Sequence, residues 1–376
     1  MIRFNKPYIT GNEVDHINKI MNDGRLSGNG SYTKMCQAFF EERYGFNKTL
    51  LTTSCTDALE MCAILLDLQS GDEVIVPSFT FVSTANAFRL LGAEIRFADS
   101  SMDTPNMTIA EIEPLITDKT RAIVIVHYAG VACDMDPIME LAKEHELIVI
   151  EDAAQAINSY YKDKPLGSIG HLAAFSFHET KNLHCGEGGL LVINDEQFEK
   201  RAEIIWEKGT NRAAFFRGEV DKYNWVDLGS SFLPSELNAA FLWAQLEQLD
   251  DIQKMRTSIW NTYYKTLQGS DLKDNVEIIP IPEFATNNGH MFYFLCKNGE
   301  TRNELLKYLN ELKIQAVFHY LPLHDSPYYE QFYKGGTIER VIDYSERLIR
   351  LPFYNELEQG EIESICSAVV DFFQKH

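Results

Sequence analysis

Short apolar runs alternate with amphipathic stretches between about residues 50 and 195. The apolar runs predict buried strands, and the stretches with apolar residues at helical spacing predict helices between them. The predicted strands are 73–79, 94–99, 121–128, 147–152, 173–177 and 189–194. The predicted helices are 56–68, 84–92 and 135–145. Strands that alternate with helices in this way predict an α/β fold with a mostly parallel sheet.

The pattern changes after a predicted helix at 198–210. Residues 211–235 are aromatic, mixed in charge and too long for a simple connector, which indicates a functional or interface loop. Two long helical patterns follow, and the remainder predicts a smaller α+β domain with strands near 276–280, 291–296 and 314–320 and helices near 302–312 and 360–373. Since 376 residues exceed what one core usually spans, we expect a large domain over 1–249 and a small C-terminal domain over 250–376.

Composition narrows the class of partner. A formal net charge of −21 disfavours nucleic acid as the main partner, because phosphate binding needs a basic surface. The chain has no run near the ~20 apolar residues of a membrane span and no signal-peptide pattern, so we expect a cytoplasmic protein that does not bind membranes. The seven cysteines are scattered without C-x-x-C spacing, and we expect neither a disulfide framework nor a metal site.

Two residues suggest covalent cofactor chemistry. Asp152 ends the strongly apolar strand LIVIED, where it either caps the next helix or faces a protonated heteroaromatic nitrogen. Lys181 lies just beyond the strand AAFSF and before a Gly-Glu-Gly-Gly turn. A loop lysine is most often solvated, but one beside a cofactor pocket can form a Schiff base. The pair fits pyridoxal phosphate, whose ring nitrogen needs a carboxylate partner.

A phosphate subsite is predicted where small polar residues run directly into a helix. The amides of Cys55, Thr56 and Asp57 would lie at the positive end of that helix, although the same pattern also serves as a plain N-cap. Ser176 offers a hydroxyl, or bonds only to backbone. Phe81 follows a strand and either stacks on a pyridine face or packs in the core.

The order of several motifs carries a family resemblance. SCTDAL, PSFTFVSTANA, HYAGVACDMD, VIEDAAQA, FSFHETKN with GEGG, GTNR and AVFHYLPLH follow one another along the chain. Together they resemble the sugar nucleotide aminotransferases of the DegT/DnrJ/EryC1/StrS family, which are pyridoxal-phosphate enzymes of fold type I. The resemblance covers essentially the whole chain and is strongest to the subgroup that makes 4-amino-4,6-dideoxygalactose for enterobacterial common antigen.

The resemblance implies roles for individual residues. Lys181 would be the Schiff-base lysine and Asp152 the partner of the pyridine nitrogen. Gln155 would lie near the cofactor ring, and Phe81 would stack on it. The remaining implied cofactor residues are Cys55, Thr56 and Ser176, with Ser231 where many family members place an asparagine that reaches the phosphate across a dimer. Weaker candidates for the sugar nucleotide are His178, Arg212, Arg217, Lys222, Tyr223, His319 and Tyr320.

The resemblance also implies a reaction and an assembly. The amino group of L-glutamate would pass to C4 of dTDP-4-keto-6-deoxy-D-glucose, giving dTDP-4-amino-4,6-dideoxygalactose and 2-oxoglutarate, in a homodimer. The C4 epimer dTDP-4-amino-4,6-dideoxyglucose and amination at C3 stay open. A regulator without catalysis and a dehydration at C3 are disfavoured by the intact Lys181.

Overall fold

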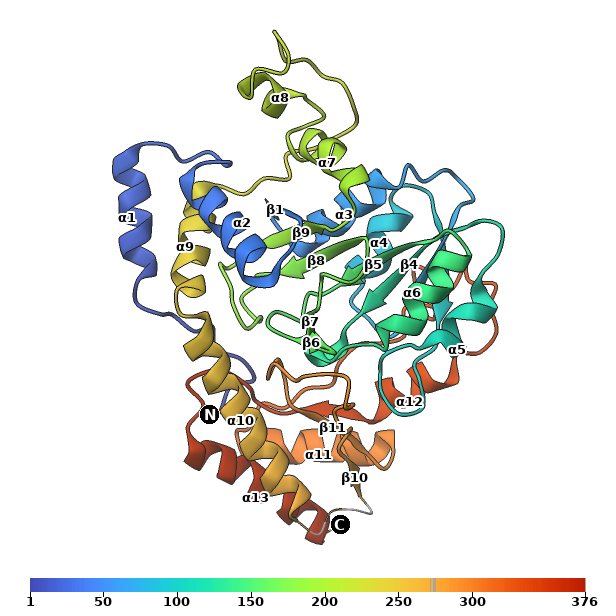
Figure 1. The fold of residues 1–376 in the computed structure, drawn as a ribbon. Coiled ribbons are helices and arrows are strands. Elements are labelled where there is room, and N and C mark those ends of the chain that lie inside the picture. The colour runs from blue at the N-terminus through green and yellow to red at the C-terminus, as the bar shows by residue number, and fades with distance from the viewer. Residues whose placement is uncertain (271, 273–274, 376) are drawn as a thin grey trace.

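The computed structural model describes residues 1–270, 272 and 275–375. Its centre is a seven-stranded sheet in the order β1-β9-β8-β5-β4-β2-β3 (Figure 1). The strands are β1 (Lys48–Thr52), β2 (Glu73–Pro77), β3 (Glu94–Ala98), β4 (Thr120–Val126), β5 (Ile148–Asp152), β8 (Leu172–Ser176) and β9 (Gly189–Ile193). Neighbours from β8 to β3 are parallel, whereas β9 is antiparallel to β1 and β8. The predicted mostly parallel α/β sheet is confirmed.

Helices cover both faces of this sheet, which explains why its strands are apolar at consecutive positions. On one face α2 (Ser31–Tyr44), α6 (Met135–Glu144) and α9 (Glu236–Leu246) share a core with β4 and β8. On the other face lie α3 (Cys55–Leu65), α4 (Ser83–Arg89) and α7 (Glu199–Trp206). The six predicted strands are present within two residues at either end, whereas β1, α1 (Glu13–Asp23) and α2 were not predicted.

Short elements complete the large unit. They are α5 (Ile109–Ile112), η1 (Glu113–Leu115), η2 (Tyr128–Gly130), η3 (Glu196–Phe198) and the hairpin of β6 (Tyr160–Tyr161) and β7 (Lys164–Pro165). The outer strand β3 has a covered edge, because the Tyr329 hydroxyl accepts from Ile95 N at 2.9 Å and donates to Ile95 O at 3.1 Å. A side chain from the C-terminal part of the chain thus pairs with β3 where another strand would.

A second, three-stranded sheet has its own core below the first (Figure 1). It consists of β10 (Val276–Glu277), β11 (Tyr293–Cys296) and β12 (Leu348–Arg350), surrounded by α10 (Leu249–Gln268), α11 (Gly299–Glu311), α12 (Glu339–Arg347) and α13 (Gln359–Lys375). The predicted strand at 314–320 is wrong. The segment makes only isolated bridges, from Ile314 to Ile2 and from Val317 to Arg350 at the outer edge of β12, so it pairs with β12 at one residue instead of along a strand. The domain boundary at 249/250 remains a prediction.

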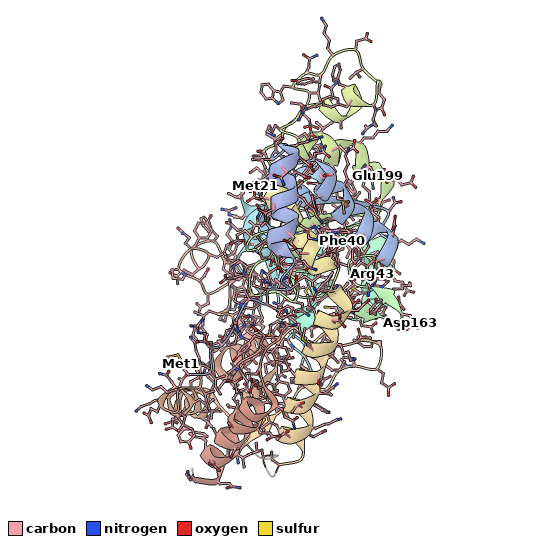
Figure 2. All side chains as sticks on the ribbon, turned by 90° about the vertical axis from the view of Figure 1, so that its left-hand side faces the viewer. Met1, Met21, Phe40, Arg43, Asp163 and Glu199 are labelled. Carbon is pink, nitrogen blue, oxygen red and sulfur yellow. The ribbon has the colours of Figure 1, made fainter. Side chains whose placement is uncertain are left out.

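An excursion between residues 207 and 231 projects from the large sheet, as both views show (Figures 1 and 2). It contains the short helix α8 (Arg212–Phe216), which has no buried residue. Backbone bridges close its base, joining Glu207 to Ser231 and Thr210 to Trp225. Within the described part of the chain, no helix combines the length and the apolar character that crossing a bilayer requires.

Candidate active site

A cavity of about 620 Å³ lies at the carboxyl ends of the parallel strands, where the small sheet approaches the large one. Ligands of open α/β sheets bind at this end of the strands, and the volume suits a small-molecule site. Asp152 ends β5, Ser176 ends β8, and Arg350 ends β12. The predicted residues that line the cavity are Cys55, Thr56, Phe81, Asp152, Gln155, Ser176, His178, Lys181, His319 and Tyr320.

Asp152 is a buried carboxylate that is held from two sides. Thr84 donates its hydroxyl to Oδ2 at 2.7 Å, and the amide of Ala154 donates to Oδ1 at 3.2 Å. The hydroxyl of Thr80 lies 2.8 Å from that of Thr84 and extends the chain of polar groups. Burial raises the pKa of Asp152, whereas these hydrogen bonds and the charge of Lys181 act in the opposite direction. A bound cation would stabilise the ionised form.

Glu151, the preceding residue, anchors this strand end on the opposite side. It is fully buried, and its carboxylate accepts from the amides of Gly167 and Gly170 at 2.7 and 2.6 Å and lies 2.9 Å from Nε2 of His127. Although burial opposes its charge, the hydrogen bonds hold the pKa of Glu151 below its ordinary value. The two adjacent carboxylates therefore have different roles. Glu151 is hydrogen-bonded to protein groups, whereas Asp152 faces the cavity.

Lys181 lies in a tight loop after β8. Its amide donates to His178 O at 2.9 Å, which curls the chain, while Nζ has no hydrogen-bond or ion-pair partner among the described residues. Burial lowers the pKa of Lys181, and the charge of Arg350 lowers it further against the opposing effects of Cys55 and Asp152. A lysine with a lowered pKa supplies more of the neutral amine that attacks a carbonyl carbon.

The start of α3 forms one end of the cavity. Ser54 caps this helix by accepting from Asp57 N at 3.1 Å, as the N-cap alternative predicted, and a phosphate contact from the amides at this helix start stays a prediction. Gly189 brings β9 close to this point, because a Cβ there would lie 2.3 Å from Ser54 C and 2.5 Å from Cys55 N. The hydroxyl of Thr56 donates to Ser83 at 2.8 Å. Backbone and hydroxyl groups at a helix start suit a phosphate.

Aromatic and amide groups line the wall beside Asp152. Gln155 accepts from Ala129 N at 2.6 Å and donates to the Tyr320 hydroxyl at 2.9 Å. The rings of His319 and Tyr320 stack at 3.7 Å between centroids. Phe81 is 57% exposed in the free protein, so it is not a core residue and its ring is available to a planar ligand.

The predicted residues of the excursion lie away from the cavity of their own chain. Arg217 pairs with Glu203 and Glu219 at 2.9 and 2.7 Å, and Arg212 lies 3.6 Å from Glu207. Lys222, Tyr223 and Ser231 are exposed. Among the residues that the structure describes, the lining of the cavity includes none of these five. Their predicted ligand contacts stay predictions.

Several lining residues were missed from the sequence. Thr84 and Arg350 line the cavity together with His290, whose pKa burial lowers far below its ordinary value. The signal for Arg350 was present, since it is a lone charge in the otherwise apolar run LIRLPFY. Thr84 gave no such signal, because a threonine near a helix start is ordinary.

The donor set has the chemistry that pyridoxal phosphate requires. Asp152 offers a buried carboxylate to a ring nitrogen, Lys181 offers an aldehyde an amine that has no partner among the described residues, and the start of α3 offers polar groups to a phosphate. Fold and site together define a pyridoxal-phosphate-dependent transferase of fold type I. The sequence profile of the DegT/DnrJ/EryC1/StrS aminotransferase family matches residues 7–370, and the chain belongs to this family.

Similar proteins agree with this class. The chain is 33% identical to the spore coat polysaccharide biosynthesis protein SpsC of Bacillus subtilis (strain 168), over 98% of this chain and 96% of that protein. It is 32% identical to a GDP-perosamine synthase of Escherichia coli O157:H7, over 98% and 97%. The PLP form of a putative sugar aminotransferase, Spr1654 of Streptococcus pneumoniae, superposes with a TM-score of 0.91 at 25% identity, over 100% and 99% of the chains. The cofactor of this sugar aminotransferase family is pyridoxal phosphate.

Proposed function

We propose that this sugar aminotransferase moves the amino group of L-glutamate to C4 of dTDP-4-keto-6-deoxy-D-glucose, giving dTDP-4-amino-4,6-dideoxygalactose. The observation that supports the aminotransferase chemistry is that Lys181 and Asp152 line the same cavity. Burial lowers the pKa of Lys181 and raises that of Asp152. The choice of sugar and carbon rests on the subgroup resemblance of FSFHETKN and EKGTNRAAFFRGEVDKYNWVDLGSS.

The cofactor, when bound, supplies an electron sink for the carbanion formed next to the transferred nitrogen. Nζ of Lys181 would hold the cofactor, and Lys181 would carry the proton to and from the reacting carbon. Asp152 would keep the ring nitrogen protonated, because a nearby carboxylate favours the charged form. Thr84 orients that carboxylate through its 2.7 Å hydrogen bond.

The remaining predicted residues bind and orient. Thr56 and Ser176 hold the phosphate together with the amides at the start of α3, including that of Cys55. Phe81 would offer its ring for stacking on the cofactor, and Gln155, which is hydrogen-bonded to Tyr320, would lie near the cofactor ring. His178 and His319 line the space left for the sugar.

The proton delivered by Lys181 sets the configuration at C4, because only the sugar face that Nζ reaches receives it. Delivery of the proton to the other face would give the C4 epimer dTDP-4-amino-4,6-dideoxyglucose. Amination at C3 is the second alternative. The nucleotide is a separate question. The similarity to a GDP-perosamine synthase makes a GDP-linked 4-keto sugar the competitor that any test must include.

The proposed setting is a cytoplasmic homodimer that supplies an amino sugar to enterobacterial common antigen, O-antigen or lipopolysaccharide. A second subunit would bring Ser231 and the charged groups of the excursion to the cavity of its partner, since these residues do not reach their own. A symmetric dimer gives both cavities the same contacts.

The test is incubation of the holoenzyme with L-glutamate and either dTDP-4-keto-6-deoxy-D-glucose or its GDP counterpart, followed by NMR of the amino sugar. We expect product from the dTDP substrate, with proton couplings of the galacto configuration at C4. Gluco couplings identify the epimer, nitrogen on C3 identifies the other regiochemistry, and turnover of the GDP substrate alone overturns the assigned nucleotide.

A further inference from the structure

A second cavity, of about 390 Å³, lies along the outer strand β3 of the large sheet, and we call it the edge cavity. Its walls come mainly from β3, from the end of α4 and from the loop that leads into α12. Among the described residues, the edge cavity and the cofactor cavity have no lining residue in common. A ligand in the edge cavity would therefore take no direct part in amino transfer.

Three cationic side chains line the edge cavity, and none of them donates a hydrogen bond to a carboxylate among the residues that the structure describes. The guanidinium of Arg89 lies over the ring of Phe332, 4.6 Å from its centroid. Arg96 on β3 approaches Glu73 only to 3.8 Å. Lys334 is exposed, with no ion-pair partner in the described chain. Three positive charges are thus available to a ligand.

The carboxylates that line the edge cavity compensate these cations poorly. Asp99 accepts from Val341 N at 2.8 Å at the start of α12, and Glu111 accepts from Thr108 N at 2.8 Å in a capping box. Those backbone amides stabilise the two negative charges where they are. Glu94, the third carboxylate, is exposed. The edge cavity is therefore locally cationic, although the whole chain carries a formal net charge of −21.

The loop at 334–338 adds backbone donors to the same cavity. Within the described part of the chain, the amides of these five residues donate to no acceptor. The Tyr333 hydroxyl donates to Gly336 O at 2.8 Å, and a Cβ at Gly335 would lie 2.4 Å from that hydroxyl, so the loop is folded closely over the ring. Successive free amides beside cationic side chains form a concave site of the kind that binds phosphate.

We propose that the edge cavity binds a small phosphorylated ligand, whose phosphate oxygens accept from Arg96, Lys334 and the amides of the 334–338 loop. Phosphate suits the site better than a carboxylate does, because it brings more than one negative charge and three acceptor oxygens to three cations. The volume of about 390 Å³ is within the range of small-molecule sites. This binding site is additional to the proposed aminotransferase function and does not depend on it.

Such a ligand would join two parts of the molecule. Arg96 belongs to β3 of the large sheet, whereas Lys334 lies in the loop that leads into α12, beside the small sheet. A phosphate held by both side chains would fasten that loop to the edge of the large sheet. Because only the folded protein brings these groups together, ligand binding should raise the thermal stability of the enzyme.

The experiment is calorimetry of the holoenzyme with inorganic pyrophosphate, comparing wild type and R96Q/K334Q with R121Q/K307Q as the charge-matched control. Arg121 lies on β4 of the same sheet and also pairs with a carboxylate, that of Asp72 at 3.0 Å, while Lys307 is exposed on α11. We expect the dissociation constant of pyrophosphate to rise about 10- to 100-fold in R96Q/K334Q and to stay within about twofold of wild type in the control.

A second arm measures thermal unfolding of the same holoenzymes. Pyrophosphate should raise the unfolding midpoint of wild type and of the control, but not that of R96Q/K334Q. Unchanged affinity in R96Q/K334Q places the pyrophosphate elsewhere and overturns the assignment, and so does the absence of saturable binding to wild type. If the double variant does not fold, K334Q alone decides, because its side chain is exposed and its affinity should fall about 3- to 10-fold. Failure of the proposed sugar reaction appears separately, since neither arm contains a sugar or an amino donor.

Discussion

The cavity and the excursion at residues 207–231 differ in what holds their side chains. Cavity groups come from distant parts of the chain and are fixed by intrachain contacts, as Thr84 fixes Asp152. The backbone of Trp225 takes part in a bridge at the base of the excursion, yet Trp225 and Phe216 are 81% and 70% exposed. Exposed aromatic clusters mark interaction surfaces. Asp152 is thus held within its own chain, while the excursion presents a surface whose proposed cover is a second subunit.

The largest expected effect tests the cavity side of this comparison. Replacing Lys181 by alanine should lower glutamate-dependent turnover by more than about 10,000-fold, because the covalent anchor and the proton carrier are lost together. Pre-steady-state kinetics and absorbance of the bound cofactor measure both losses. K200A, on the exposed surface of α7, is the control and should behave as wild type. A K181A enzyme with ordinary turnover contradicts the assigned role.

The next effect concerns the carboxylate. D152N should reduce the rate of the glutamate half-reaction by about 100- to 1000-fold, because a neutral amide no longer stabilises a protonated ring nitrogen. The cofactor should still bind, since Lys181 and the start of α3 are unchanged, and its absorbance maximum should shift. D221N, in the excursion, serves as the charge-matched control. Equal half-reaction rates in the two variants would argue that Asp152 acts only as a helix cap.

Glu151 should affect stability more than chemistry. E151Q leaves His127 and the buried amides with a poorer acceptor and should lower the free energy of unfolding by roughly 3 kcal/mol at pH 7. Because the folded-state pKa of Glu151 is lowered, its contribution is present above the unfolded glutamate pKa and is lost as pH falls through the folded value. Urea unfolding between pH 7 and pH 4 tests this, with exposed E304Q as control. A pH-independent difference between E151Q and wild type contradicts it.

The smallest effect belongs to the excursion. W225A should change the unfolding free energy of a single subunit by less than about 0.5 kcal/mol, because Trp225 packs on little in its own chain. If the excursion is the dimer contact, the dimer dissociation constant should rise about tenfold, which sedimentation measures. L312A, at an exposed leucine following α11, should alter neither quantity. A large loss of subunit stability in W225A would remove the contrast between the two regions.

Prediction from the sequence succeeded where pattern and packing agree. The strands β2, β4, β5, β8 and β9 are almost wholly buried, so their apolar runs stand out, and the sequence alone placed Asp152 and Ser176 at strand ends. It failed where tertiary pairing decides. The segment 314–320 has a strand-like composition, but it pairs with the outer edge of β12 only at Val317, which makes an isolated bridge with Arg350.

The candidate site divides in the same way. Lys181 and Asp152 were found because Asp152 ends a strand and Lys181 lies just beyond one, each in a recognisable motif. Thr84 and Arg350 were missed because their importance depends on which residue the fold places beside them, Asp152 in one case and the cavity in the other. The contacts proposed for Ser231 and Lys222 depend on a second chain, which no intrachain pattern can report.

The hydrogen bonds between the Tyr329 hydroxyl and Ile95 of β3 have a consequence for solubility. An open edge strand is a template on which another chain can add a strand, and such addition leads to aggregation. Tyr329 occupies both the N–H and the C=O of Ile95, so one side chain blocks the middle of that edge. Because Tyr329 lies far beyond β3 in the chain, a nascent polypeptide carries this strand with its edge open through most of synthesis. Chaperone dependence should be greatest in that interval, before Tyr329 has left the ribosome.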